Sequence, residues 1–474
     1  MSRSLVQAAL GLLILASAAR PEADPPNIVV IYCDDLGYAD LGCYGSKICR
    51  TPNLDRMAAE GVRFTDFYVS SAVCSASRAA LLTGAYHERV GIRGALGPND
   101  RTGLNHAETT IAELLKSRGY ATGMAGKWHL GCRPSQLPIH HGFDEFLGVP
   151  YSADMWPNHP EAPKNYPPLP LIDGDKPVLF DVTADDQRAF TTRFADRAIA
   201  FIRRNKDRPF FFYLAPNMPH VPLFVAREHE GSTDRGLYAD VIAEIDDSVG
   251  KILATLNELK LDEKTLVIFS SDNGPWLSYG DHAGSAGPLR EGKGTSYEGG
   301  IRVPMIARWP GQIPAGTTRH EPAATIDLLP TIAGLTQAPL PDRTLDGKDL
   351  TPLLRGEPGA RPPHDALFFY YANGQLQAVR SERWKLLFPH TARSMIGQKP
   401  GAGGIPGKYK PLAVGLELYD LETDLGETRN LALDRPEVVQ ELQGKADTIR
   451  EQLGDSLQKK VGTAVRKAGV ATEK

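Results

Sequence analysis

Two continuous apolar runs along the chain each end at acidic or amide side chains. Residues 27–33 form a β-branched stretch that stops at Asp34 and Asp35. Residues 265–270 repeat the arrangement just before Asp272 and Asn273. Continuous apolar runs of this length are typical of strands that are buried on both faces of a sheet. The pattern therefore predicts two central strands that end in polar side chains.

Helical patterns separate these runs. Residues 110–118 and 237–259 show helical spacing, and further apolar runs such as 209–214 lie between the two predicted strands. Alternation of this kind predicts an α/β sandwich with a large, mostly parallel central sheet flanked by helices, over residues 25–364. Ligands bind such sheets at the carboxyl ends of the strands, so we expect the two polar strand ends to converge there.

The polar strand ends form a set of oxygen ligands. Three carboxylates and one amide suit Ca²⁺, and Mg²⁺ less comfortably, whereas zinc sites require sulfur or several histidines. Taken singly, an Asp-Asp pair after a strand can simply cap a helix, and Asp-Asn-Gly is a common turn. Two such ends in one chain favour a metal site made of Asp34, Asp35, Asp272 and Asn273.

The pattern changes from about residue 365. Short strand signals at 366–371, 376–380, 384–388 and 416–420 precede a helical pattern at 436–453. We expect a smaller C-terminal domain over residues 365–456, with a short antiparallel sheet and a packed helix. The basic residues 457–474 contain few large apolar side chains, which predicts a frayed, flexible tail.

Two segments rich in proline and glycine, residues 150–180 and 386–412, are predicted to be long surface loops. Loops of this kind often frame a substrate pocket. We expect them, together with residues 94–106, to contact the part of the substrate that does not react.

The first 24 residues resemble a secretory signal peptide, with an early arginine, a short apolar run and a small-residue cleavage pattern. The chain lacks Asn-x-Ser/Thr acceptor sites, which for an exported protein favours a bacterial periplasm or exterior. A net charge of -4 over 474 residues gives no field for nucleic acid or membranes. The five cysteines are too few for a disulfide scaffold; Cys43 and Cys49 could pair, but the sequence does not decide the connectivity among Cys33, Cys43, Cys49 and Cys132.

A cysteine at the start of a predicted helix is the most informative candidate for chemistry. Cys74 is followed one turn later by Arg78. Helix N-terminal N–H groups favour negative charge, and an arginine adds a fork of donors, so a nucleophile and an anion receptor could share this end. Taken alone, the spacing favours a half-buried cysteine that opens an ordinary helix.

Residues 74–78, Cys-Ser-Ala-Ser-Arg, followed by Leu-Thr-Gly at 82–84, resemble the motif of the sulfatase family, in the alkaline phosphatase superfamily. Residues 148–152 are similar to the arylsulfatase A and galactosamine-6-sulfatase branch. The resemblance spans residues 27–453, and its specificity lies in the joint order of further motifs: Asp34-Asp35-Leu36-Gly37-Tyr38, Gly126-Lys127-Trp128-His129-Leu130-Gly131, His141-Gly142-Phe143-Asp144, Asp272-Asn273-Gly274, Gly292-Lys293-Gly294 and Tyr297-Glu298-Gly299-Gly300.

The resemblance implies that Cys74 is converted to formylglycine, whose hydrate attacks the sulfur of a sulfate ester. It also implies a Ca²⁺ site made of the four strand-end residues and position 74. The family usually has proline where this chain has Ala76. That departure leaves open whether the common formylglycine-generating enzyme or an anaerobic maturase performs the conversion.

Further roles follow from the same resemblance. Arg78, Lys127 and Lys293 would neutralise charge on the sulfuryl oxygens. His129 would take a proton from the second hydroxyl of the hydrate, so that the sulfated intermediate releases sulfate. His220 and Lys293 would protonate the leaving alcohol, and Ser152 would donate a hydrogen bond to the sulfate.

The expected function is thus Ca²⁺-dependent sulfuric ester hydrolysis by an exported protein, acting on an aryl sulfate in vitro and on a sulfated small molecule or glycan in nature. A phosphodiester or phosphonate monoester hydrolase of the same superfamily is the enzymatic alternative, because fold alone does not choose between them. A non-catalytic protein that binds sulfated glycans is the third interpretation, if Cys74 stays unmodified. We expect no nucleic acid partner and no membrane association after signal cleavage.

Overall fold

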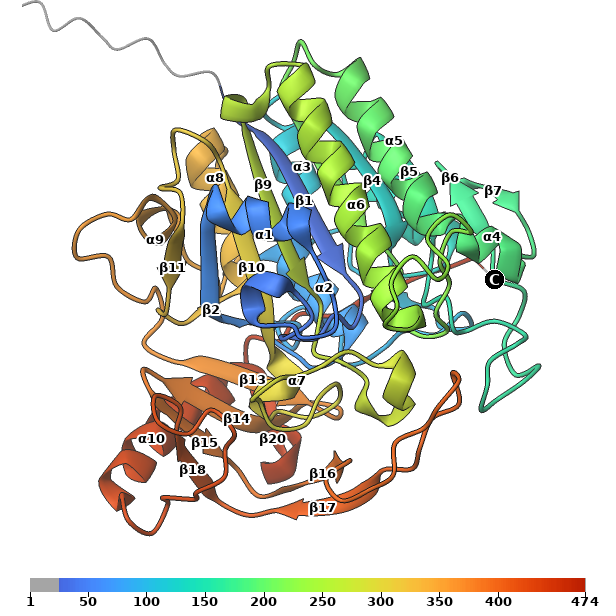
Figure 1. Cartoon of the computed structure of the whole chain (residues 1–474). Coiled ribbons are helices and arrows are strands. Elements are labelled where there is room, and N and C mark those ends of the chain that lie inside the picture. The colour runs from blue at the N-terminus through green and yellow to red at the C-terminus, as the bar shows by residue number, and fades with distance from the viewer. Residues whose placement is uncertain (1–24, 474) are drawn as a thin grey trace, which may run out of the picture.

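A mixed sheet of eleven strands crosses the larger part of the molecule (Figure 1). The structure is a computed structural model and describes residues 25–473, so the predicted signal peptide lies outside the described residues. β12 (Ala323–Ala324) pairs with β2 beside the main path, whose order is β11 (Thr317–Arg319), β2 (Val62–Tyr68), β10 (Arg302–Arg308), β9 (Thr265–Ser271), β1 (Asn27–Cys33), β8 (Phe210–Ala215), β4 (Ala121–Lys127), β5 (Glu145–Val149), β6 (Leu171–Asp173) and β7 (Lys176–Leu179).

The middle of the sheet is parallel. β9, β1, β8, β4 and β5 all run in one direction, whereas β10, β6 and β7 pair antiparallel with their neighbours. The expected α/β fold with a large central sheet is confirmed, with parallel pairing at its centre and mixed pairing towards its edges. The carboxyl ends of β1, β9, β8 and β4 therefore meet at one edge.

Strand β1 shows why the sheet has helices on both faces. All seven of its residues are buried, and successive side chains point to opposite faces. Ile28, Val30 and Tyr32 join one apolar core, while Val29 and Ile31 join the other. Apolar residues of α2 (Cys74–Thr83), α3 (Ile111–Lys116) and α8 (Leu328–Thr336) lie in the first core, and those of α1 (Pro52–Ala59), α5 (Phe190–Arg204) and α6 (Leu237–Glu258) lie in the second.

The helices on these faces follow their sequence signals. In α3, Thr110 and Glu113 form a capping box, with bonds of 2.7 and 3.1 Å that satisfy the first free N–H groups of the helix. Figure 1 shows α5 and α6 side by side across one face of the sheet. Neither α6, at 22 residues, nor any other described helix is long and apolar enough to span a bilayer. The remaining α-helices of this part are short: α4 (Ala184–Arg188), α7 (Glu298–Ile301) and α9 (Thr351–Arg355).

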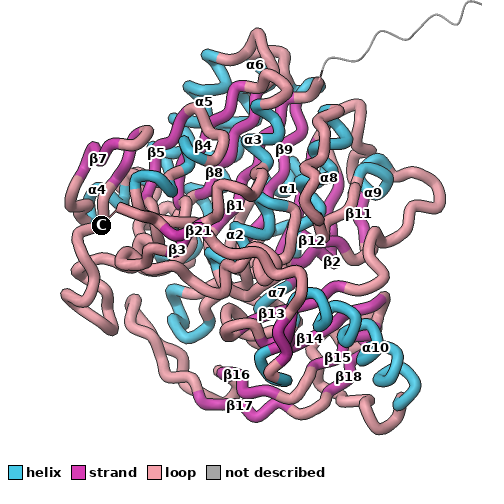
Figure 2. Tube along the Cα trace, turned by 180° about the vertical axis from the view of Figure 1, so that it is seen from behind, coloured by secondary structure: helices cyan, strands magenta, loops and turns pink. Residues whose placement is uncertain are grey.

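A second, four-stranded antiparallel sheet lies below the first, with α10 (Pro436–Leu453) beside it (Figure 2). The strand and helix patterns expected after residue 365 all occur within one or two residues of their predicted limits. The order of this sheet is β13 (Leu367–Tyr371), β14 (Gln375–Ser381), β15 (Trp384–Leu387) and β18 (Glu417–Asp420).

The two predicted surface loops contain strands, and in this respect the prediction was wrong. Residues 150–180 include β6 and β7, which extend the main sheet as a hairpin. Residues 386–412 include β16 (His390–Ser394) and most of β17 (Lys410–Val414), which pair into a separate two-stranded ribbon. These strands are short and rich in polar residues or proline, so no apolar alternation marks them in the sequence.

The basic C-terminal segment packs against the larger part of the molecule, and here the structure differs from the expectation of a frayed tail. β21 (Gly469–Val470) pairs with β3 (Thr102–Gly103), and β20 (Lys460–Val461) pairs with β19 (Gly454–Asp455). Arg466 forms an ion pair with the buried Glu108 at 2.8 Å. Main-chain pairing and one charge-assisted contact hold this segment in place, although it has little apolar surface.

All five cysteines are free in this structure, so the pairing of Cys43 with Cys49 that the sequence left open does not occur.

Candidate active site

The ends of the parallel strands bring the predicted oxygen ligands together. Asp34 and Asp35 follow β1, and Asp272 and Asn273 follow β9, whose last residues are in register with those of β1. The backbone N–H of Asp35 donates to Asp272 Oδ1 at 3.1 Å, and Asn273 Nδ2 donates to Asp35 Oδ1 at 2.6 Å. The four residues therefore form one buried cluster, as the sequence predicted.

Two residues at these strand ends adopt the left-handed backbone conformation that usually favours glycine. Asp35 has a φ of 62° and His129 a φ of 60°. A non-glycine residue in this region costs free energy and persists only when its surroundings hold it there. The backbone N–H of Leu36, next to Asp35, donates to Ser271 Oγ at 2.9 Å. The backbone N–H of His129 donates to the Pro150 carbonyl at 3.1 Å. These hydrogen bonds hold the two residues in an unfavourable backbone conformation that directs their side chains into the site.

Cys74 is the first residue of α2, and every residue of this helix is buried. The preceding Val73 offers no capping side chain, so the N–H groups of the first turn face the site without a side-chain acceptor at the cap. Burial raises the pKa of the Cys74 thiol, although Lys127 acts against this shift. An unmodified thiol here is therefore neutral near pH 7 and a weak nucleophile.

Arg78 and Lys127 lie beside the carboxylates of the cluster. Arg78 Nη2 is 2.7 Å from Asp272 Oδ2, and Lys127 Nζ is 2.6 Å from Asp34 Oδ2. Burial alone would raise the pKa of Asp34, but Lys127 and the other nearby cations outweigh it and hold this pKa well below its usual range. Burial and the neighbouring Asp34 charge raise the pKa of Asp272. The site therefore contains tightly coupled charges of both signs.

Lys293 and Ser152 complete the polar wall. Lys293 Nζ is 2.7 Å from Asp35 Oδ1, and Lys127 Nζ donates to Ser152 Oγ at 3.0 Å. Burial lowers the pKa of Lys293, but the Asp35 carboxylate reverses the effect and the net shift is upward. Lys293 therefore remains a cation at neutral pH, able to face an anionic substrate.

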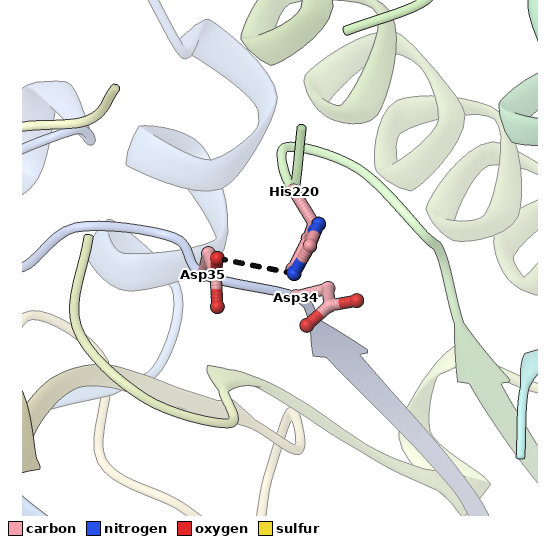
Figure 3. A group of neighbouring side chains, drawn as sticks. All are labelled: Asp34, Asp35 and His220. Atoms are coloured by element: carbon pink, nitrogen blue, oxygen red, sulfur yellow. Dashed lines mark ion pairs between the residues drawn. The ribbon is translucent and has the colours of Figure 1, made fainter. Parts of the chain in front are cut away.

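The two predicted histidines face the cluster with different hydrogen bonds. His129 Nε2 is 2.8 Å from the Leu96 carbonyl oxygen, and its buried Nδ1 has no protein partner among the described residues. Burial, with help from Lys127, holds the pKa of His129 well below its usual range, so the ring is neutral. His220 Nδ1 bonds the Val221 carbonyl, and its Nε2 lies 3.5 Å from Asp35 Oδ2 (Figure 3).

The cluster fits a hard cation such as Ca²⁺. Asp34 Oδ1 and Asn273 Oδ1 are buried oxygens without a hydrogen-bond partner among the described residues. Asp34, Cys74 and Asp272 each offer a ligand atom, and these atoms lie within 4.8 Å of one another. Buried acceptors without donors are costly, and a divalent cation would satisfy them. The donor set is dominated by oxygen, which matches calcium better than zinc.

The sequence pattern did not identify Trp276. Its ring centre lies 5.5 Å from that of His220 and 4.5 Å from Lys293 Nζ. Trp276 follows Asp272-Asn273-Gly274 by two positions, and this closeness to a polar strand end was the available signal. The indole contacts both groups expected at the leaving alcohol, so it forms one wall of the site.

Family comparisons agree with this geometry. The family model described as Sulfatase matches residues 26–338, and the model for the C-terminal region of aryl-sulfatase matches residues 362–469. A model described as N-sulphoglucosamine sulphohydrolase, C-terminal, matches residues 292–394. Together these matches cover both sheets of the molecule.

Individual relatives cover most of the chain. Arylsulfatase A of Homo sapiens is 44% identical over 460 residues, which span 91% of this chain and 89% of the relative. The N-acetylgalactosamine-6-sulfatase of Canis lupus familiaris is 41% identical and covers 84% of this chain and 78% of its own. The solved structure of the sulfatase PsFucS1 from Pseudoalteromonas sp. superposes with a TM-score of 0.79 at 27% identity, over 90% of this chain and 91% of that one. The chain therefore belongs to the sulfatase family, with the alkaline-phosphatase-like fold, and is a sulfuric ester hydrolase of the arylsulfatase type.

Proposed function

We propose that this protein hydrolyses a sulfate ester in a Ca²⁺-dependent reaction at a formylglycine formed from Cys74. One observation carries the proposal: Cys74 opens a fully buried helix and lies among the buried cations Arg78, Lys127 and Lys293 and the strand-end carboxylates. A neutral, buried thiol does not need three cations, whereas a sulfuryl group in transfer does.

Ca²⁺ would be held by Asp34, Asp35, Asp272, Asn273 and the side chain at position 74. The ion would supply Lewis acidity and charge neutralisation at the reacting oxygens. The unpartnered Asp34 and Asn273 oxygens support this assignment. Formylglycine, once hydrated, would supply a hydroxyl nucleophile and a second hydroxyl that allows sulfate release.

The cations are placed to stabilise charge on the sulfate. Lys127, hydrogen-bonded to both Asp34 and Ser152, and Lys293, on the opposite carboxylate, remain protonated because each faces a buried anion. Their ammonium groups, the Arg78 guanidinium and the Ser152 hydroxyl would bind the sulfuryl oxygens. Preorganised donors of this kind stabilise the transition state without reorganisation.

The two histidines divide the proton transfers. His129 donates its Nε2 hydrogen to the Leu96 carbonyl, which leaves Nδ1 as a neutral acceptor for the proton of the second hydroxyl at position 74. His220 holds the Val221 carbonyl with Nδ1 and presents Nε2 to the site. We assign His220, with Lys293, the delivery of a proton to the leaving alcohol.

The natural substrate we propose is a sulfated carbohydrate, encountered outside the cytoplasm after signal cleavage. The name of the canine relative, N-acetylgalactosamine-6-sulfatase, supports a sugar substrate. A formylglycine-generating enzyme or an anaerobic maturase would act on the chain during biosynthesis, with Ala76 in its recognition motif.

The decisive experiment compares 4-nitrophenyl sulfate with 4-nitrophenyl phosphate, using protein coexpressed with a maturase and supplied with Ca²⁺. Mass spectrometry first establishes the aldehyde at position 74. We expect a clear preference for sulfate, and Cys74→Ala should lower the rate on the order of 10⁴-fold or more because the nucleophile is lost. Cys43→Ala, a half-buried cysteine outside the site, is the control and should retain activity.

Preference for the phosphate would support a phosphohydrolase instead. Absence of turnover of both esters, despite the aldehyde at position 74, would contradict an arylsulfatase reaction and favour either strict specificity for the natural substrate or a binding role.

A further inference from the structure

A cavity of about 410 Å³ lies next to the Lys293 turn, between the β16–β17 ribbon and the smaller sheet. The proposed catalytic roles do not use it. The cavity lies beside Lys293, which is assigned to the leaving alcohol. It is therefore placed to hold the part of the substrate that remains after sulfate release. Six of its lining residues are Gly294, Tyr371, Gln377, Thr391, Arg393 and Lys410.

Arg393 is held rigidly at this cavity. Its Nη2 and Nε donate to the Lys293 carbonyl oxygen at 2.6 and 3.2 Å, and its guanidinium carbon is 4.5 Å from the Tyr409 ring centre. Gly294 has a φ of +79°, and a Cβ there would lie 2.4 Å from Arg393 Nη2. Only glycine therefore permits this approach of the guanidinium to the turn, and the arginine has little freedom left to lose on binding.

The charge of Arg393 is not neutralised by the protein. Among residues 25–473, no carboxylate oxygen lies within 4 Å of its guanidinium, whereas Arg383, on the neighbouring sheet, pairs with Asp420 and Glu422. Lys410 adds a second positive charge to the same cavity. A half-buried arginine with free donors and no counterion is a ready receptor for an anion.

Arg393 and Lys293 both lie close to one aromatic ring, that of Trp276. The Arg393 guanidinium carbon lies 5.8 Å from the Trp276 ring centre, and Lys293 Nζ lies 4.5 Å from it. One substrate can therefore contact both cations, with the sulfate at Lys293 and another group at Arg393. Because both cations lie against the same indole, two substituents on one substrate ring can reach both of them.

We propose that this cavity binds the alcohol part of the substrate and that Arg393 selects substrates with a second anionic group, a carboxylate or another sulfate, one ring away from the ester. The inference rests on the proposed function and deepens it: the substrate class becomes sulfated saccharides with more than one negative charge. Arg393 is a specificity-determining residue, and the bond-breaking step does not require it.

Two isosteric substrates test the assignment. 4-Carboxyphenyl sulfate carries a charge across the ring from the ester, and 4-carbamoylphenyl sulfate replaces that charge by a neutral amide of the same shape. The measured quantity is the ratio of kcat/KM for the charged substrate to kcat/KM for the neutral one, in which any general effect on Lys293 cancels. Arg393→Gln should lower this ratio about ten- to a hundredfold, the range for one charge-assisted hydrogen bond.

Arg393→Lys keeps the charge but loses the planar fork, so it should recover part of the ratio. Lys399→Gln removes a positive charge from the same ribbon segment without lining the cavity, and it should leave the ratio unchanged. A ratio in Arg393→Gln within twofold of wild type, or an equal fall in Lys399→Gln, would overturn the subsite. Absence of turnover of both substrates by the matured wild type would overturn the proposed function itself, and the subsite with it.

Discussion

Buried charges gather at two places in this molecule, the active site and the contact between the two sheets. At the second place, Asp66 accepts from Arg302 at 2.7 Å and from Arg380 at 2.6 Å, one cation on each oxygen. Glu298 likewise binds Lys385 on one oxygen and Arg302 with Tyr68 on the other. We call Asp66, Glu298, Arg302, Arg380, Lys385 and Glu427 the interface cluster.

The active site has a similar density of buried charge, but some of its polar atoms lack hydrogen-bond partners. Asp34 Oδ1 and Asn273 Oδ1 have no donor among the described residues, and His129 Nδ1 also lacks a partner. In the interface cluster, Asp66 and Glu298 have hydrogen-bond partners on both oxygens, and Glu427 Oε1 lies 2.8 Å from the Lys385 ammonium. Burial of charge therefore does not mark function by itself; the unpaired atoms within a charged cluster do.

The largest effect is expected from breaking the complete cluster. Lys385 Nζ lies 2.9 Å from Glu298 and 2.8 Å from Glu427, and all three side chains are fully buried. Lys385→Met would leave two buried carboxylates without their shared cation, at a cost of about 3–5 kcal/mol of unfolding free energy. Urea denaturation of both proteins measures the change.

Lys445→Met is the matched control, because Lys445 pairs with the exposed Asp365 at the surface. Its cost should stay below about 1 kcal/mol. If the two lysine variants lost equal stability, the interface cluster would contribute no more to the fold than a surface ion pair does.

The incomplete cluster should respond to calcium, and the interface cluster should not. At a Ca²⁺ concentration a hundred times its Kd, binding to the folded state should add about 2.7 kcal/mol to stability, seen as a rise in Tm. Asp272→Asn removes one ligand charge and should abolish most of this rise. Asp66→Asn removes a carboxylate from the interface cluster and should leave the calcium response intact, even if its own Tm is lower. A wild-type Tm insensitive to Ca²⁺ would refute the metal assignment.

The sequence predicted the central elements well because burial on two faces leaves a continuous apolar run. β1 begins and ends where the pattern placed it, and β9 is one residue longer. The ribbon β16–β17 was missed because its short strands carry no apolar alternation, and the C-terminal strand β21 was missed because its pairing depends on a distant partner. β21 contains two residues, and its partner β3 lies more than 360 positions earlier, so no local periodicity records it.

The same distinction divides the active site. The strand-end carboxylates and Cys74 have local signals, since polar residues after a buried strand and a cysteine before a helix are visible in the sequence. Arg393 has none, because its contact with the Lys293 carbonyl joins segments 100 positions apart. The pairing of His129 with the Leu96 carbonyl is also a tertiary contact, and the left-handed backbone that aims His129 cannot be inferred from residue type.

Unpartnered atoms on neutral buried groups do not mark a functional site in the same way. Both ring nitrogens of His141 lack partners among the described residues, yet the ring stacks on His106 at 4.8 Å and packs near Trp128 at 5.5 Å, away from any carboxylate contact. An unpartnered atom without charges around it therefore indicates a cost to the fold, and no ligand is expected there. Burial lowers the pKa of His141 to about 3, and that of His87 likewise to about 3.

This cost predicts the smallest effect, a loss of stability in mild acid. Because the unfolded chain takes up a proton near pH 6.5 and folded His141 does not until about pH 3, stability falls as the pH drops through this interval. Between pH 7 and pH 5 the loss should be about 2 kcal/mol for His141, from roughly 1.4 kcal/mol per pH unit. His141→Phe keeps a stacked ring without the titration, so urea denaturation at the two pH values should show a difference smaller by that amount. The exposed His320→Gln should retain the full wild-type dependence. If the pH response were unchanged in His141→Phe, the His141 ring would be protonated in the folded state at pH 5. An unpartnered buried nitrogen would then mark a charged group.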